Sequence, residues 1–391
     1  MIYLSHLRCT SCGKEYAVDE VRYLCPDCAK DYRAGMPLIG VLEVVYDYAA
    51  LSADARLGSE DIQSFVDCFS AVDPIYYPPL PVGSTPLFEA ERLNSEIGIA
   101  KMLIKYDGLN PSGSLKDRAS FLMVAEANRL GINEIVCAST GNAACSLSAI
   151  CAAAGKKAVI FTPAKAPAAK LVQIAIHGAE LHKVDGTYDD AFARALSYAD
   201  SPQTLNRNTG YHPYTIEGKK TVGLEIYLQM GRKVPDWIAI PTGDGVILSG
   251  VHKAFVDLQR TGLIDRLPRL LSVQAQSSDA ITNYWQSGVY LDASAPATIA
   301  DSISVKTPSN AHGAVKALQE SHGASLTVSD DEIRMAQKDF AVLAGVFVEP
   351  SSAATFAGAR KAKTRGLISE SETLVLLATG HGLKDINAVR I

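Results

Sequence analysis

The sequence predicts an α/β protein with mostly parallel sheets, preceded by a small segment that carries four cysteines. Apolar strand candidates alternate with helical stretches that end in glycines such as Gly131, Gly155 and Gly178. Strands that alternate with helices over short loops indicate βαβ units, whose strands run parallel. The strand candidates cover residues 135–138, 158–161, 180–184, 237–240, 271–274 and 374–378. A length of 391 residues allows two or three domains.

Two CxxC pairs mark the first segment. Cys9 and Cys12 form one pair, Cys25 and Cys28 the other, and twelve residues separate the pairs. Four thiolates brought together in this way match a tetrahedral structural zinc site, whereas a redox CxxC would need a βαβ context that this segment lacks. We therefore expect residues 1–46 to form a ribbon-like segment with a structural zinc, or a metal-free remnant of such a site.

Composition points away from nucleic acid and membrane partners. The net charge is -5, and the chain has no run of lysines or arginines. Residues 1–8 lack the apolar stretch of a signal peptide, and no segment approaches the roughly 20 apolar residues that span a bilayer. The other cysteines, Cys68, Cys137, Cys145 and Cys151, are scattered in apolar segments, as in a reducing compartment. We expect a cytoplasmic protein that acts on small molecules.

After residues 47–100, which read as irregular with a proline-rich extended connector, the run NPSGSLKDR opens a helix. It places Lys116 in the first helical turn, where the positive end of the helix disfavours the charged ammonium. A lysine in this setting is a plausible imine-forming amine. A solvated lysine at a helix start explains this segment alone equally well.

A second loop, STGN, lies between a strand and a helix at residues 143–154. It consists of Ser139, Thr140, Gly141 and Asn142. Backbone N–H groups at a helix start suit an anionic carboxylate, and the Asn142 amide can hydrogen-bond a ring hydroxyl. A simple N-cap role for Asn142 is the alternative.

Two further loops follow strands near the middle and the end of the chain. The first loop has glycines where the backbone must approach an anion closely, so it is a candidate phosphate cradle. Its residues are Gly243, Asp244, Gly245 and Val246. In the second loop, TGHGLKD, the Thr379 hydroxyl could face a pyridine nitrogen as a neutral partner that leaves the nitrogen largely unprotonated. We interpret His381 as a structural loop residue.

In this order, the four loops resemble the fold-type II pyridoxal 5'-phosphate (PLP) enzymes, and specifically the threonine synthase family, which is similar to the tryptophan synthase β chain. NPSGSLKDR is similar to the family's NPTGSFKDR, and STGN and TGHGLKD match its loops. Supporting matches are IEGKKT at residues 216–221 and EPSSA at residues 349–353, and the resemblance covers about residues 80 to 385.

The resemblance implies a fold and an assembly. It implies a large PLP-binding α/β domain formed by residues 47–100 and 212–391, and a small α/β domain formed by residues 101–211, with PLP in the cleft between them. A homodimer is also expected from the family. The implied activity is that of a carbon–oxygen lyase of threonine biosynthesis, which converts O-phospho-L-homoserine and water to L-threonine and phosphate.

The resemblance also implies residue roles. Lys116 would hold PLP as an imine and act as the acid and base at the substrate carbons. Asn142 would contact the ring hydroxyl, the loop from Gly243 to Val246 would bind the cofactor phosphate, and Thr379 would face the ring nitrogen. The substrate carboxylate would be bound by residues 139–142.

The chain departs from the family at three places. Thr215 stands where an arginine usually grips the substrate phosphate, Ala143 stands where a threonine is common, and Asp244 brings a negative charge into the cradle. The substrate phosphate has therefore lost expected partners. Candidates to replace them are Lys165, Lys170, Arg207, His212 and Lys219.

These departures leave two other functions open. One is a PLP-dependent ammonia-lyase of the serine/threonine dehydratase type, or a β-replacement enzyme that acts on another small amino acid. The other is a PLP-binding regulatory or metal-ribbon interaction protein that has lost catalysis. The intact Lys116 argues against the latter, since a protein without turnover has no evident need for this lysine.

Overall fold

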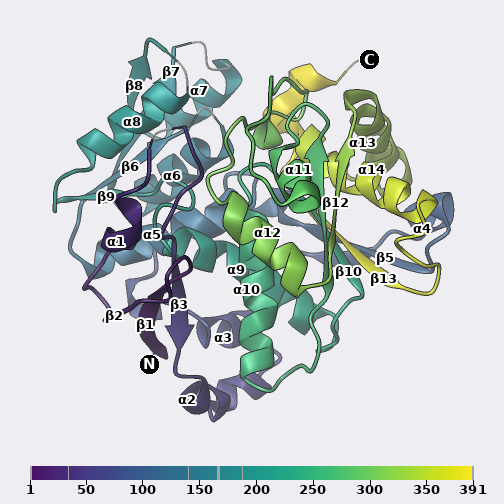
Figure 1. Cartoon of the computed structure of the whole chain (residues 1–391), viewed down its shortest axis with the longest axis horizontal. Coiled ribbons are helices and arrows are strands. Elements are labelled where there is room, and N and C mark those ends of the chain that lie inside the picture. The colour runs from purple at the N-terminus through teal and green to yellow at the C-terminus, as the bar shows by residue number, and fades with distance from the viewer. Residues whose placement is uncertain (1, 34, 140, 165–167, 187, 390–391) are drawn as a thin grey trace. The chain divides into compact units, whose positions relative to one another are not determined.

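The computed structural model describes residues 2–33, 35–139, 141–164, 168–186 and 188–389 (Figure 1). It contains two compact units. The first comprises Met1–Gly83, Lys116–Thr221 and Arg260–Gly262, and the second comprises Ser84–Leu115, Val222–Gln259 and Leu263–Ile391. None of the helices in the described ranges is long and apolar enough to cross a membrane.

The first unit begins with a small antiparallel sheet in the order β2-β1-β3. Its elements are β1 (Leu4–Cys9), β2 (Glu15–Tyr16), the short helix α1 (Pro26–Ala29) and β3 (Leu42–Tyr46). β1 pairs with both neighbours, so the first CxxC lies at the end of the central strand. This arrangement agrees with the ribbon-like segment expected from the cysteine spacing.

Short helices follow in the segment that reads as irregular in sequence. They are α2 (Tyr48–Ser52), η1 (Ala55–Gly58), α3 (Ile62–Asp67) and η2 (Pro74–Tyr76). Each starts after an aspartate whose carboxylate accepts a hydrogen bond from a backbone N–H of the first turn. The capping aspartates are Asp47, Asp54, Asp61 and Asp73. The interpretation of residues 47–100 as irregular was therefore wrong, since a short strand and a further helix also lie within residues 87–97.

The main sheet of the first unit is parallel throughout, in the order β8-β7-β6-β9. Its strands are β6 (Glu134–Ala138), β7 (Lys157–Pro163), β8 (Glu180–Val184) and β9 (Thr204–Asn206). The accompanying helices are α5 (Lys116–Arg129), α6 (Asn142–Ala153), α7 (Ala168–Ile176), α8 (Tyr188–Tyr198) and α9 (Tyr214–Gln229), the last of which continues into the second unit. Val136, Val159 and Ala195 form part of its buried core.

The second unit is built on a six-stranded sheet in the order β12-β11-β10-β13-β5-β4. Only β4 is antiparallel to its neighbour. The strands are β4 (Leu87–Glu89), β5 (Lys101–Tyr106), β10 (Trp237–Pro241), β11 (Arg269–Ala275), β12 (Ala324–Val328) and β13 (Thr373–Ala378). The α-helices are α4 (Glu91–Ile97), α10 (Val246–Arg260), α11 (Ala280–Ser287), α12 (Ala311–Glu320), α13 (Asp330–Ala344) and α14 (Pro350–Thr364), and the 3-10 helices are η3 (Asp107–Leu109), η4 (Asp301–Ile303) and η5 (Gly382–Ala388).

Helix α14 covers the centre of this sheet, where it packs against β10, β11, β12 and β13, and α13 packs on α14. Small residues on α14 allow the close approach. A Cβ at Gly358 would lie 2.4 Å from a methyl of Val273 on β11. The two predominantly parallel sheets agree with the α/β class expected from the alternating pattern.

The units do not divide the chain at residues 47, 101 and 212. Residues 101–115, expected in the small domain, supply β5 to the six-stranded sheet, where it pairs in parallel with β13. Residues 47–83, expected in the large domain, belong to the first unit. Strand partners are set by tertiary packing, which the order of segments along the chain does not reveal.

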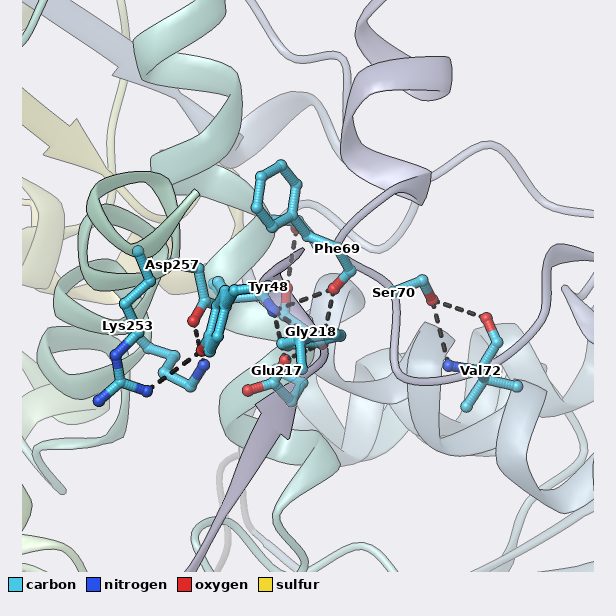
Figure 2. A network of polar contacts seen from close by, with 12 residues as sticks. Tyr48, Phe69, Ser70, Val72, Glu217, Gly218, Lys253 and Asp257 are labelled. Atoms are coloured by element: carbon cyan, nitrogen blue, oxygen red, sulfur yellow. Dashed lines mark hydrogen bonds and ion pairs between the residues drawn. The ribbon is translucent and has the colours of Figure 1, made fainter. Parts of the chain in front are cut away.

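A buried ion pair ties α9 to the N-terminal part of the first unit (Figure 2). Lys220 and Glu217 pair on one face of α9, and both side chains are almost fully buried. The Lys220 ammonium also donates to the Tyr46 hydroxyl at 2.8 Å and to the Phe69 carbonyl at 2.9 Å. The Tyr46 hydroxyl lies 2.6 Å from the Glu217 carboxylate. The IEGKKT motif therefore holds the N-terminal segment against α9.

We expect Glu217→Gln to lower the free energy of unfolding by about 3–5 kcal/mol, because it leaves the Lys220 charge buried without its partner. The double variant Glu217→Leu with Lys220→Met removes both charges and should recover most of this loss. Chemical denaturation of the two variants measures the difference. Asp331→Asn, which breaks an exposed pair with Arg334, is the control. A loss for Glu217→Gln no larger than the loss for this control would contradict the structural role.

Candidate functional site

Lys116 is the first residue of α5, so the expected position in the first helical turn is confirmed. The backbone just before it is held in the second unit. The Leu115 N–H donates to the Thr379 carbonyl at 2.8 Å, and Ser114 forms an isolated bridge with Gly380. The first part of the NPSGSLKDR run, up to Leu115, and the TGHGLKD loop are nearly 270 residues apart in sequence and are hydrogen-bonded neighbours in the second unit.

The STGN loop follows β6 and leads into α6. Asn142 is the first residue of α6 and is buried, while Gly141 occupies the N-cap position and no side chain caps the helix. The N-cap alternative for Asn142 is therefore wrong. The Ser139 hydroxyl accepts a hydrogen bond from the Gly141 N–H at 3.1 Å. Thr140, the remaining residue of the predicted loop, lies outside the described residues.

Thr215 has a local structural role. Its side chain is fully buried, its hydroxyl donates to the His212 carbonyl at 2.8 Å, and the same oxygen accepts from the Gly210 N–H at 3.0 Å. The hydroxyl proton is thus used within the turn that precedes α9. Thr215 shapes this turn and does not replace the positive charge of an arginine.

His212 does not replace that charge either. Burial, together with the positive charges of Arg22 and Arg129, lowers the pKa of His212 to about 3, so its imidazole is neutral at pH 7. Its Nδ1 accepts from the Tyr214 N–H at 3.1 Å, which leaves the proton on Nε2. His212 was a candidate cation in the sequence, and only its burial reveals that it is neutral.

Of the other four candidate cations, three are buried and one lies outside the described residues. Lys165 lies outside the described residues. Lys170 is buried in α7, and Lys219 is fully buried in α9. Arg207, directly after β9, is also fully buried.

The loop between β10 and α10 is tightly packed. Gly245 has φ +82°, and a Cβ there would lie 2.8 Å from the carbonyl oxygen of Asn310. Both the backbone conformation and the lack of space therefore require glycine at this position. The Asp244 carboxylate accepts from the Val246 N–H at 2.9 Å and so caps α10. The departure from the family at Asp244 therefore has a structural cause. A Cβ at Gly243 would lie 2.9 Å from Ile303 Cα.

Thr379 follows β13 and is buried. Its hydroxyl lies 3.2 Å from the hydroxyl of Ser352 on α14, and Ser352 Oγ accepts from the Gly380 N–H at 2.9 Å. Ser352 belongs to the EPSSA match, but the sequence alone did not assign it a place beside Thr379. The structural role expected for His381 is confirmed, because its Nδ1 accepts from the Leu383 N–H at the start of η5.

The four cysteines of the N-terminal segment form one cluster, in which all the sulfur atoms lie within 4.8 Å of one another. Cys9 and Cys28 Sγ are 3.8 Å apart, and Cys12 and Cys25 Sγ are 3.9 Å apart. Four sulfurs about 2.3 Å from a central zinc ion would be about 3.8 Å from each other. Gly40 lies against the cluster with φ +76°, and a Cβ there would come within 2.9 Å of Cys28 Cβ. The cluster can hold a tetrahedral metal ion.

Comparisons with known proteins bear on these loops. A family model described as pyridoxal-phosphate dependent enzyme matches residues 79–380. The threonine synthase of Methanosarcina acetivorans is 38% identical, covering 98% of this chain and 93% of that protein. The threonine synthase of Methanocaldococcus jannaschii is 36% identical, covering 97% of this chain and 93% of that protein.

Solved structures show the same fold. A threonine deaminase from T.th. superposes with a TM-score of 0.65 at 25% identity, covering 76% of this chain and 92% of that chain. The processed threonine deaminase isoform 2 of Solanum lycopersicum superposes with a TM-score of 0.69 at 22% identity, covering 85% of this chain and 93% of that chain.

The match over residues 79–380 defines a class, the fold-type II pyridoxal-phosphate dependent enzymes. The two full-length relatives are both threonine synthases. The chain belongs to the pyridoxal-phosphate dependent enzymes and, within them, to the threonine synthase family.

The neutral His212 predicts a loss of stability in acid. In the unfolded chain this imidazole takes up a proton below about pH 6.5, but in the folded chain it does so only near pH 3. Stability from this group is therefore complete above pH 6.5 and falls by up to about 1.4 kcal/mol per pH unit as the pH drops towards 3. We expect His212→Asn to flatten this acid limb in denaturation experiments between pH 4 and pH 7. An unchanged slope would contradict the buried neutral state.

Proposed function

We propose that this chain converts O-phospho-L-homoserine and water to L-threonine and phosphate with bound PLP. The observation that carries the proposal is its likeness over nearly its whole length to proteins named threonine synthase. Supporting it, the backbone that leads to Lys116 is hydrogen-bonded to Thr379, so two of the motifs behind the resemblance are linked.

The residues present fit a PLP group. Lys116 at the start of α5 provides the amine. The loop from Gly243 to Val246 provides backbone N–H groups before α10 for a phosphate, apart from the Val246 N–H, which donates to Asp244. Asn142 is buried at the uncapped start of α6, and Thr379 has a hydroxyl partner in Ser352. PLP, when bound, supplies an electron sink that stabilises negative charge at the carbons of the substrate.

Each group of the chain then has a task of its own. Lys116 holds the cofactor and, once released from it, accepts and returns a proton at the substrate carbons. The backbone at the N-terminus of α6, together with Ser139, binds the substrate carboxylate. Thr379 and Ser352 are uncharged, so a ring nitrogen held beside them would have no counter-charge and would stay largely unprotonated.

A second function remains a candidate because of Thr215. Its hydroxyl is engaged in the turn before α9, so the usual substrate-phosphate arginine has no substitute at that position. An ammonia-lyase that acts on serine or threonine needs no phosphate site. The same assay, with serine and threonine as parallel substrates and keto acid as the readout, separates the two functions.

We expect purified protein loaded with PLP to release phosphate and form threonine in equal amounts from O-phosphohomoserine. Lys116→Ala should lose the visible absorbance of the bound cofactor and reduce the rate by at least about 100-fold, because both cofactor attachment and proton transfer are lost. Lys338→Ala, at an exposed lysine of α13, is the control and should leave both readouts unchanged. Keto acid from serine or threonine without phosphate release would favour the ammonia-lyase, and an unchanged absorbance in Lys116→Ala would refute the cofactor assignment.

We also propose that the four-cysteine cluster holds a structural zinc ion. Sulfur separations of 3.8 and 3.9 Å support a tetrahedral thiolate site. Elemental analysis should find about one zinc per chain, and the double variant Cys9→Ser with Cys12→Ser should lose it and unfold at a lower temperature. Cys68→Ser, which changes a buried thiol outside the cluster, is the control. A fully folded wild type without metal would refute the zinc assignment.

We propose a cytoplasmic location, which is supported by eight free cysteines, four of them in the cluster and four elsewhere in the chain. The homodimer and the small amino-acid substrate implied by the family remain predictions. Size-exclusion chromatography with light scattering tests the first, and the assay above tests the second.

A further inference from the structure

The first unit buries a guanidinium that has no carboxylate partner among the described residues. Arg207 is fully buried, its Nε donates to Ser120 Oγ at 3.2 Å, and its Nη1 donates to Thr209 Oγ1 at 2.7 Å. Its Nη2 is buried and meets no acceptor in the part of the chain that the structure describes. Arginine stays charged in proteins, so this position is unfavourable unless an anion compensates it.

Two lysines add positive charge at the same place. Burial raises the pKa of the Cys137 thiol, while the charges of Arg207, Lys219 and Lys116 oppose this rise. The three cations are therefore close enough for their charges to act on one side chain of β6. Lys219 reaches this region because α9 lies directly on α5, where a Cβ at Gly218 would be 2.3 Å from the Arg118 carbonyl oxygen.

The backbone places Arg207 beside the STGN loop. Its N–H donates to the Val136 carbonyl at 2.8 Å, which continues the pairing of β9 with β6. The next residue, Asn208, accepts from the Ala138 N–H at 2.7 Å, and its amide nitrogen is a buried donor with no acceptor among the described residues. Ser139 follows Ala138 directly. Unused donors and uncompensated charge thus gather at the carboxyl ends of two parallel strands, where α/β proteins bind ligands.

We propose that Arg207, with Lys219 and the amide of Asn208, binds the phosphate group of the substrate as a dianion. This inference rests on the proposed function and deepens it, because it identifies the residues that take over from the arginine absent at Thr215. A phosphate oxygen accepts a hydrogen bond from Nη2, and the negative charge of the phosphate balances the positive charge of the guanidinium. The Ser120 and Thr209 hydroxyls orient the guanidinium plane for this contact.

Thermal unfolding of the PLP-loaded protein in phosphate-free buffer tests the site without turnover. Inorganic phosphate should raise the Tm of the wild type and leave the Tm of Arg207→Met unchanged. Without phosphate, Arg207→Met should be at least as stable as the wild type, since it removes an uncompensated buried charge. Lys105→Met is the matched control, because Lys105 is equally buried but already paired with Glu225 at 2.6 Å. It should lower the Tm and keep the response to phosphate.

Kinetics then distinguish the substrate's phosphate from free phosphate. Arg207→Gln should raise the KM for O-phosphohomoserine by about 10- to 100-fold, the usual effect of losing a hydrogen bond to a charged group, and Arg207→Lys should restore part of it. The cofactor absorbance should not change in either variant. Weaker inhibition by inorganic phosphate with an unchanged KM would mean that Arg207 binds only the released product, which would overturn the assignment to substrate.

The remaining outcomes separate this inference from the proposed function. Normal turnover with no effect of Arg207 on KM or on the phosphate response would overturn the inference and leave the function standing. An Arg207-dependent phosphate response without turnover of O-phosphohomoserine would support an anion site for another phosphate ester and refute the proposed function. Loss of the cofactor absorbance in Arg207→Met would place Arg207 at the cofactor, and so overturn the inference.

Discussion

The parallel pairing of β6 with β9 is the constraint on which the site in the first unit depends. The register sets Val136 opposite Asn206, the last residue of β9, so β9 ends shortly before β6, which itself ends at Ala138. The chain after β6 becomes the STGN loop, and the chain after β9 becomes the segment that starts with Arg207. Two segments more than 60 residues apart in sequence therefore present their polar groups at one edge. A shift of one residue would turn the buried side chains of β9 to the opposite face.

The buried cations discussed above are of two kinds, those with a carboxylate partner and those without one in the described ranges. Lys220 and Lys105 each have a carboxylate partner, Glu217 and Glu225 respectively, and these pairs hold segments of the fold together. Arg207 has the hydroxyls of Ser120 and Thr209 and the thiol of Cys137 as partners, and no carboxylate among the described residues. A buried charge without a counter-charge is unfavourable for folding, and this is the reason why we propose a bound anion at Arg207.

The sequence predicts those parts of the protein that depend on local pattern. Alternating apolar segments predicted the parallel sheets, and the CxxC spacing predicted the cysteine cluster, because both signals are local. The assignment of β5 to the six-stranded sheet depends on pairing with β13, which lies about 270 residues further along the chain. The helices capped by Asp47 and Asp61 have a local signal, an aspartate before the first turn, which the interpretation of an irregular segment overlooked.

The roles of individual residues in the site were harder to predict, because the type of an amino acid does not reveal its burial or its hydrogen-bond partners. Thr215 and His212 are polar in the sequence, yet the structure uses one in a turn and keeps the other neutral. Tyr23 is an example of a residue whose contacts lie far away in the sequence. It lies two residues before Cys25, its hydroxyl accepts from the Asn206 N–H at 3.0 Å, and its ring packs on Tyr211 and His212. The N-terminal ribbon thus contacts the segment that carries Arg207, although the ribbon lies outside the residues that the family model matches.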